Sequence, residues 1–285
     1  MDTNSFSVIP MGQQLFLDPG EVYSGSITVA NLSSSVDDLS FQVNISPYSV
    51  IGSEYSADFL AKSSHTEIVD WITIENPTGV LAPNESKVVN YTITVPEDAA
   101  PGGQYAAFSV ISNPSGSNSG GLSIGNVYEI ASLIYANISG AIHREGTVLE
   151  NSVPGFSVNN AIKTTAIIEN KGNTHEDAIF SFALTNAITG ETIYPKTNEN
   201  AGYSEIIMPD TTREITRDFT GLPIVGVVKV NQTIRYNDET YVTEQNLIIC
   251  PIWLIILILA LISGLIAFIA SRIKHHETRK RATQL

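Results

Sequence analysis

Short segments in which apolar and polar residues alternate run through most of the first 247 positions. In the segment 87–95 the apolar side chains fall on one face: Val89, Tyr91, Ile93 and Val95. The segment 39–45 repeats this pattern with Leu39, Phe41, Val43 and Ile45. A period of two with β-branched residues is typical of a strand that buries one face. Since no segment before residue 247 has the 3.6-residue apolar stripe of a helix, we predict an all-β body.

Turn signals separate these segments at intervals of about eight to twelve residues, which is typical of antiparallel sandwiches. The clearest are Asp18-Pro19-Gly20, Asn76-Pro77-Thr78-Gly79, Ala82-Pro83-Asn84, Pro101-Gly102-Gly103 and Thr189-Gly190. One set of strands is expected near 5–17, 22–31, 39–46, 68–75, 87–95, 104–112 and 123–138. A second set is expected near 162–170, 178–185, 191–195, 204–208, 213–219, 225–236 and 240–248. The prediction is two tandem immunoglobulin-like β-sandwiches, at 1–140 and 141–247, of which the second is nearer the membrane.

A transmembrane helix is predicted at 248–271. No charged residue interrupts the stretch from Ile248 to Ala270. As a helix this stretch is roughly 35 Å long, enough to cross a hydrocarbon core of about 30 Å. Pro251 falls near the start, where a missing N–H costs least. Trp253 lies near the same end, where it suits an interfacial anchor.

The basic tail at 272–285 sets the expected orientation. Its residues Arg272 and Lys274 flank the helix, and short basic flanks stay in the cytoplasm. Residues 1–247 are then extracellular on a single-pass cell-membrane protein. The first residues lack the basic and apolar regions of an export signal, so we expect that a signal peptide has been removed. A misassigned start, or a tail-anchored protein with a cytoplasmic body, stays open.

Composition and charge exclude several functions. The first 271 residues carry 28 acidic and 10 basic side chains, so a phosphate backbone would be repelled and nucleic-acid binding is excluded. A single cysteine excludes an intramolecular disulfide and a thiolate zinc site. His65, His143 and His175 lack ligand-type spacing, and no cofactor motif is present. We therefore expect neither a metal nor a cofactor.

One catalytic pattern is present. Residues Gly121 to Gly125 match G-x-S-x-G around Ser123. A nucleophile elbow needs a strand-to-helix turn. This match instead opens a predicted strand and no helix follows, so Ser123 is expected to be an ordinary strand residue. The chain is predicted not to be an enzyme.

The candidate binding residues are aromatic. Tyr48, Tyr55 and Phe59 lie in an irregular stretch from Ser46 to Lys62. Aromatic side chains on such a loop can stack on sugar rings or fill a partner's pocket, and the alternative is that they cover the end of the core. Trp71 is expected to be a core or half-buried strand residue.

The order of the segments resembles a known family. PMGQQLFLDPGEVYSGSITVAN opens the chain, LAPNESKVVNYTITVPEDAAPGGQYAAFSV follows, and IIENKGNTHEDAIFSF and MPDTTREI come before the helix and basic tail. This resembles the WxL-interacting proteins of bacterial cell surfaces. The resemblance implies a peptidoglycan-binding first domain, a second surface-binding domain, and a role in adhesion or scaffolding. The partners it implies are the lipid bilayer and either peptidoglycan or a secreted surface protein.

A second function stays open. Strand addition at an exposed sheet edge uses main-chain hydrogen bonds and needs no signature residues. The alternative is therefore a protein-binding or chaperone-like module of this kind.

Overall fold

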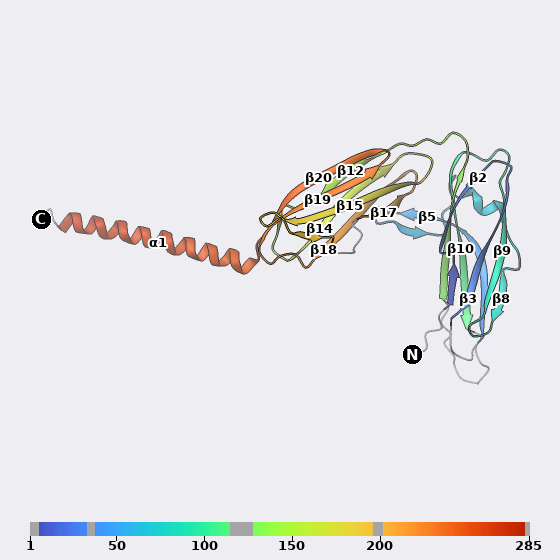
Figure 1. The fold of residues 1–285 in the computed structure, drawn as a ribbon, viewed down its shortest axis with the longest axis horizontal. Coiled ribbons are helices and arrows are strands. Elements are labelled where there is room, and N and C mark those ends of the chain that lie inside the picture. The colour runs from blue at the N-terminus through green and yellow to red at the C-terminus, as the bar shows by residue number, and fades with distance from the viewer. Residues whose placement is uncertain (1–5, 33–37, 115–127, 196–201, 283–285) are drawn as a thin grey trace. The chain divides into compact units, whose positions relative to one another are not determined.

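The structure is a computed structural model that describes residues 6–32, 38–114, 128–195 and 202–282. It is mostly β, with one α-helix at the C-terminus (Figure 1), which confirms the predicted all-β fold. The chain forms two compact units. Unit 1 contains Met1–Thr147, Ile168–Asp177 and Ile206–Glu214, and unit 2 contains Val148–Ile167, Ala178–Glu205 and Ile215–Leu285. The boundaries that we predict at 140 and 247 stay predictions.

The first sandwich is built from two sheets. One has the order β1 (Phe6–Ile9), β3 (Val22–Asn31), β9 (Ser86–Thr94) and β7 (Ile72–Ile74). The other has the order β2 (Gly12–Leu17), β11 (Tyr128–Ile138), β10 (Gly102–Pro114), β4 (Leu39–Pro47) and β8 (Thr78–Leu81). A hairpin of β5 (Ser49–Ile51) and β6 (Ser56–Asp58) and a 3-10 helix, η1 (Glu67–Trp71), complete it.

The second sandwich is built from the strands that follow. One sheet has the order β12 (Gly146–Ser152), β14 (Ala161–Asn170) and β18 (Thr211–Thr220). The other has the order β13 (Phe156–Ser157), β20 (Glu239–Ile249), β19 (Gly226–Tyr236), β15 (Glu176–Asn186) and β16 (Thr192–Tyr194), and β17 (Gly202–Ile207) also pairs with β15. The helix α1 (Ile252–Ala282) follows β20 after Cys250 and Pro251.

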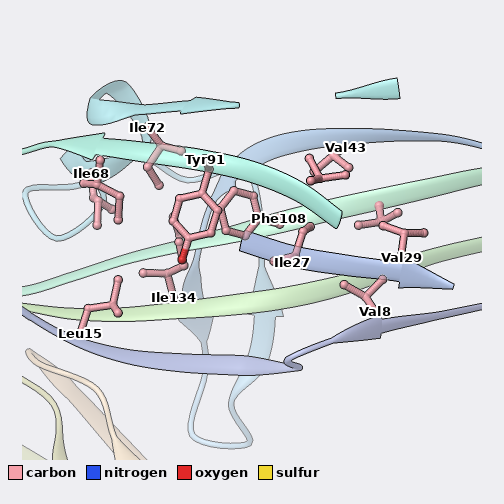
Figure 2. Packing of buried hydrophobic residues seen from close by; sticks show 14 of the residues in the cluster. Val8, Leu15, Ile27, Val29, Val43, Ile68, Ile72, Tyr91, Phe108 and Ile134 are labelled. Carbon is pink, nitrogen blue, oxygen red and sulfur yellow. The ribbon is translucent and has the colours of Figure 1, made fainter. Parts of the chain in front are cut away.

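The apolar residues of the alternating segments form the core of the first sandwich. Val89, Tyr91 and Ile93 of β9 are all buried. Tyr91 packs against Phe108 with ring centroids 4.6 Å apart, at the centre of the cluster drawn in Figure 2. Burying an apolar side chain of this size stabilises the fold by about 1.5–3 kcal/mol. Gly25 lies opposite Tyr91, and a Cβ there would meet the tyrosine ring at 2.4 Å.

Two of the predicted turns have the same construction. Gly20 and Asn84 occupy their third positions with φ of 81° and 61°, a region that favours these two residues. The fourth residue of each turn, Glu21 or Glu85, accepts a 2.8 Å hydrogen bond through its carboxylate from the N–H of the first residue. The Pro-Gly-Glu and Ala-Pro-Asn-Glu motifs are therefore accounted for by turn geometry.

Two details differ from the sequence prediction. The expected strand at 5–17 is split at Pro10 into β1 and β2, which belong to different sheets. The expected strand at 68–75 begins instead as η1, and only Ile72–Ile74 pairs with β9. Trp71 ends the 3-10 helix and packs half-buried against the core, so it is half-buried as expected but not on a strand. Alternation over so few residues does not separate a helical turn from a strand.

Candidate functional site

The helix α1 has the length and composition of a membrane span. Its segment Ile252–Arg272 is strongly apolar, and none of it is buried inside the protein. A long apolar helix without a protein partner on any face is typical of a segment that lies in lipid. This is compatible with a single-pass membrane anchor.

The four predicted anchor residues all lie at the ends of this segment or just beyond it. Pro251 directly precedes the first helical residue, and Trp253 is 58% exposed. At the other end the guanidinium of Arg272 lies 5.5 Å from the ring centroid of Phe268. Lys274 follows two residues later within α1. Their positions fit interfacial anchors.

The predicted aromatic residues divide into a pair and a separate tyrosine. The rings of Tyr48 and Phe59 lie 5.9 Å apart, and Tyr48 also meets the edge of Tyr135 at 5.8 Å. The hydroxyl of Tyr135 donates to that of Tyr48 at 3.5 Å. All three side chains are half-buried. They pack on one another, so little ring face is left for a ligand.

Tyr55 is held by different contacts, all within unit 1. Its hydroxyl accepts a 3.0 Å hydrogen bond from the N–H of Met208 and contacts the hydroxyl of Thr211. The guanidinium of Arg213 lies 4.5 Å from its ring centroid. Burial raises the pKa of Tyr55. These partners use a ring face and the hydroxyl of Tyr55, and its role in binding stays a prediction.

An aromatic cluster that the sequence did not predict lies beside Tyr135. The Tyr105 ring is 5.9 Å from Tyr135 and 5.6 Å from His175. The Tyr105 hydroxyl accepts the N–H of His175 at 2.9 Å and lies 3.2 Å from its Nδ1. Burial raises the pKa of Tyr105 and Tyr135 and lowers that of His175. The cluster is therefore neutral and has no activated acid or base.

One cavity of about 490 Å³ lies in unit 1. Phe16, which is 78% exposed, and Ile142 supply its apolar lining. Its polar lining includes Arg144, whose Nε lies 3.0 Å from a carboxylate oxygen of Glu176. The cavity combines an exposed aromatic ring with charged groups, a lining that suits a polar organic ligand.

The second sandwich has a long open sheet edge on its last strand. β20 pairs with β19 along its whole length, from Glu239 to Ile249. On its other side β13 pairs with it only at Ile248 and Ile249. Within the described residues no further strand pairs with this side. We call the stretch Glu239–Leu247 the open edge of β20.

The hydrogen bonds between β20 and β13 show which main-chain groups of the open edge point outward. The N–H groups of Ile248 and Cys250 donate to Gly155 and Ser157 at 2.9 and 3.0 Å. Because groups alternate along a strand, the even-numbered residues direct their N–H and C=O groups outward. Thr240, Val242 and Glu244 therefore present main-chain donors and acceptors. The open run of acceptors ends at Asn246, whose carbonyl accepts the side-chain amide of Gln245 at 3.0 Å.

The open edge is regular. The register with β19 runs without a shift, so no bulge bends it away from an approaching strand. No proline lies within β20. Proteins commonly block free edges with such features, together with charged side chains. Here the charged side chains of β20 are Glu239 and Glu244 alone.

The first sandwich has a shorter counterpart. β2 pairs with β11 from Leu133 to Ile138, and among the described residues no strand pairs with the outer side of residues 129–132. In both sandwiches the first strand changes sheets, from β1 to β2 and from β12 to β13. The partial cover of each last strand follows from this change.

Catalytic chemistry has little support in the described part of the chain. Among these residues no group of three or more histidine, cysteine, aspartate or glutamate side chains could hold a metal ion. Ser123 lies outside the described residues. His143 is exposed and pairs with Glu145 at 2.8 Å, and His65 lies 3.5 Å from Asp210. Neither contact joins a nucleophile to a base.

Comparison with known proteins gives no family. No protein-family model matches the sequence, and no curated protein matches it. The resemblance to WxL-interacting proteins therefore stays a prediction.

Solved structures to which the chain is similar include three chaperones or chaperone complexes. A complex of the Salmonella enterica SafA pilin with the SafB chaperone is 10% identical, with a TM-score of 0.44, and the match covers 86% of this chain and 98% of that one. The class 5 fimbriae chaperone CfaA is 13% identical, with a TM-score of 0.40 and coverage of 85% and 99%. The CsuC–CsuE chaperone–adhesion subunit complex of Acinetobacter baumannii is 13% identical, with a TM-score of 0.39 and coverage of 86% and 99%. These similarities concern architecture and carry no conclusion about binding.

Proposed function

We propose that this chain is a membrane-anchored, non-enzymatic surface protein that binds a protein partner by strand addition. The partner's extended segment pairs with the open edge of β20, and α1 holds the complex at the membrane. The body lies outside the cell, because the short basic flank at 272–285 favours the cytoplasm. This takes up the alternative function weighed from the sequence.

The observation that carries the proposal is the open edge of β20. A regular strand with unpaired outward N–H and C=O groups is a template for another chain. Thr240, Val242 and Glu244 supply three such residues in a row of alternating positions. Main-chain pairing would extend the sheet that β13, β20, β19 and β15 already form.

A proline within the open edge tests this function. Val242→Pro removes one outward N–H, while the bonds to β19, made by the odd-numbered residues, stay intact. The full-length wild-type chain and the variant are immobilised in detergent micelles and incubated with cell-surface extracts. We expect the proline variant to fail to retain a protein that the wild type captures. Val242→Thr keeps the N–H and is the matched control that retains this protein. Equal retention by the proline variant and the threonine control contradicts strand addition at this edge.

A second candidate function is glycan binding, which the family resemblance implies. The observation that favours it is the cavity beside Phe16, because an exposed ring next to charged groups suits a sugar. Retention of the full-length chain on purified peptidoglycan tests it. We expect Phe16→Ala to lower retention severalfold and Phe59→Ala, whose ring packs on Tyr48, to leave it unchanged. No retention above an equally acidic control protein rules this candidate out.

A further inference from the structure

The strands around the open edge of β20 carry mainly negative charge, although β19 contributes two cations, Lys229 and Arg235. β12, β13 and β20 together contain three carboxylates and no lysine or arginine: Glu150, Glu239 and Glu244. Asp238 adds a fourth carboxylate in the turn before β20. An incoming strand at this edge therefore meets a negative field.

β12 borders the same edge. The side-chain amide of its Asn151 donates to the carbonyl of Tyr241 at 3.3 Å, and the hydroxyl of Thr243 donates to the carbonyl of Asn151 at 2.7 Å. These contacts join β12, a strand of the other sheet, to the middle of β20. Glu150, the neighbour of Asn151, is exposed and contributes its charge there.

Apolar side chains accompany the carboxylates. Leu149 of β12 is 57% exposed, Phe156 of β13 51%, and Val242 of β20 56%. Each of these side chains is large enough to add favourable free energy to binding when a partner buries it. The edge thus offers main-chain pairing, apolar contact and negative charge on adjacent strands.

The carboxylates at this edge keep most of their negative charge for an incoming strand, because the existing ion pair is exposed to solvent. Lys229 of β19 lies 3.0 Å from Glu244, and both side chains are about half exposed. A pair this exposed is weakly held, so it reduces the field of Glu244 without removing it. The Glu239 carboxylate accepts a 2.5 Å hydrogen bond from the hydroxyl of Tyr241, which keeps its charge close to the edge.

We infer that the open edge of β20 selects an extended segment in which basic residues alternate with apolar ones. This rests on the proposed function, since charge selection needs a strand that pairs. A second copy of this chain does not fit, because two such edges carry net charge of the same sign and repel each other. The occupant is therefore a basic segment of another protein.

The test uses three synthetic peptides as long as the open edge, in which valine alternates with lysine, serine or glutamate. The full-length chain in detergent micelles is titrated with each at low salt, and amide hydrogen exchange is followed at Thr240, Val242 and Glu244. We expect the lysine peptide to slow exchange at these amides and to bind severalfold more tightly than the serine peptide, as one or two exposed ion pairs would give. The preference should weaken as salt is added.

Variants separate local charge from net charge. Combining Glu150→Gln, Glu239→Gln and Glu244→Gln should make the lysine and serine peptides bind equally. Combining Glu67→Gln, Glu75→Gln and Glu97→Gln changes the net charge of the chain equally at positions outside β12, β13 and β20, and should keep the preference.

Two outcomes overturn the inference, and they differ in what else they affect. If the serine or glutamate peptide protects the amides as well as the lysine peptide does, charge selection is wrong and strand addition stands. If no peptide slows exchange at these amides, both the charge selection and the proposed function fail. Val242→Pro should abolish binding of every peptide at this edge. Any peptide binding that survives the substitution takes place elsewhere on the chain.

Discussion

At the scale of single residues, hydrogen bonds and ring packing decide what the conspicuous side chains do. Glu21 and Glu85 each close a turn by accepting the N–H of its first residue at 2.8 Å. The binding role expected of Tyr48 and Phe59 stays a prediction, and in the structure their rings contact each other.

Gly25 should not tolerate a side chain. Gly25→Ala places a Cβ 2.4 Å from the buried ring of Tyr91, so the ring or the strand must move. We expect overpacking to lower the free energy of unfolding by about 1–3 kcal/mol. Urea denaturation of the full-length chain measures it. Gly12→Ala, where the nearest atom is 3.8 Å away, is the control and should change little.

His175 should make stability depend on pH below neutrality. Burial lowers its pKa in the folded chain, and the Asp177 charge opposes this only in part. The unfolded chain takes up the proton near pH 6.5, while the folded chain resists it, so stability is lost as the pH falls through this value. Above it both states are neutral and His175 contributes no slope.

Urea denaturation at a series of pH values between about 5 and 8 checks this. We expect His175→Gln to flatten the loss of stability at the acidic end. An identical pH dependence in the wild type and His175→Gln contradicts the assignment.

At the scale of elements, the sequence predicted most strands but not which of them expose an edge. Alternation located β4 and β9, and the uninterrupted apolar run located α1. The division at Pro10 and the 3-10 turn before Ile72 were missed, because both depend on which sheet a short segment joins. The open edge of β20 was also missed, since main-chain groups there are free only because β13 is two residues long.

A charge in the middle of α1 should weaken insertion. Ile262→Lys places an ammonium group near the centre of the apolar segment Ile252–Arg272. The cost is about 2.5–3.5 kcal/mol on insertion scales. We expect a larger fraction of the chain to be released from membranes by alkaline carbonate. Ile262→Leu is the control, and equal release of the two variants contradicts a membrane span.

At the scale of the whole molecule, the account joins a helix suited to lipid with a β body that carries one regular open edge. The membrane helix is supported by the apolar segment Ile252–Arg272, none of which is buried inside the protein. The partner remains a proposal because neither the sequence nor the fold carries a residue pattern specific to one ligand. Main-chain recognition leaves no such pattern, which is why composition and motifs gave a location more readily than a function.

The most direct test is amide hydrogen exchange along β20 in the full-length chain without a partner. We predict an alternation: fast exchange at Thr240, Val242 and Glu244, whose N–H groups point outward, and slow exchange at Tyr241, Thr243 and Gln245, which bond to β19. Uniformly slow exchange along the strand would mean that another segment already covers this edge, and would contradict the account.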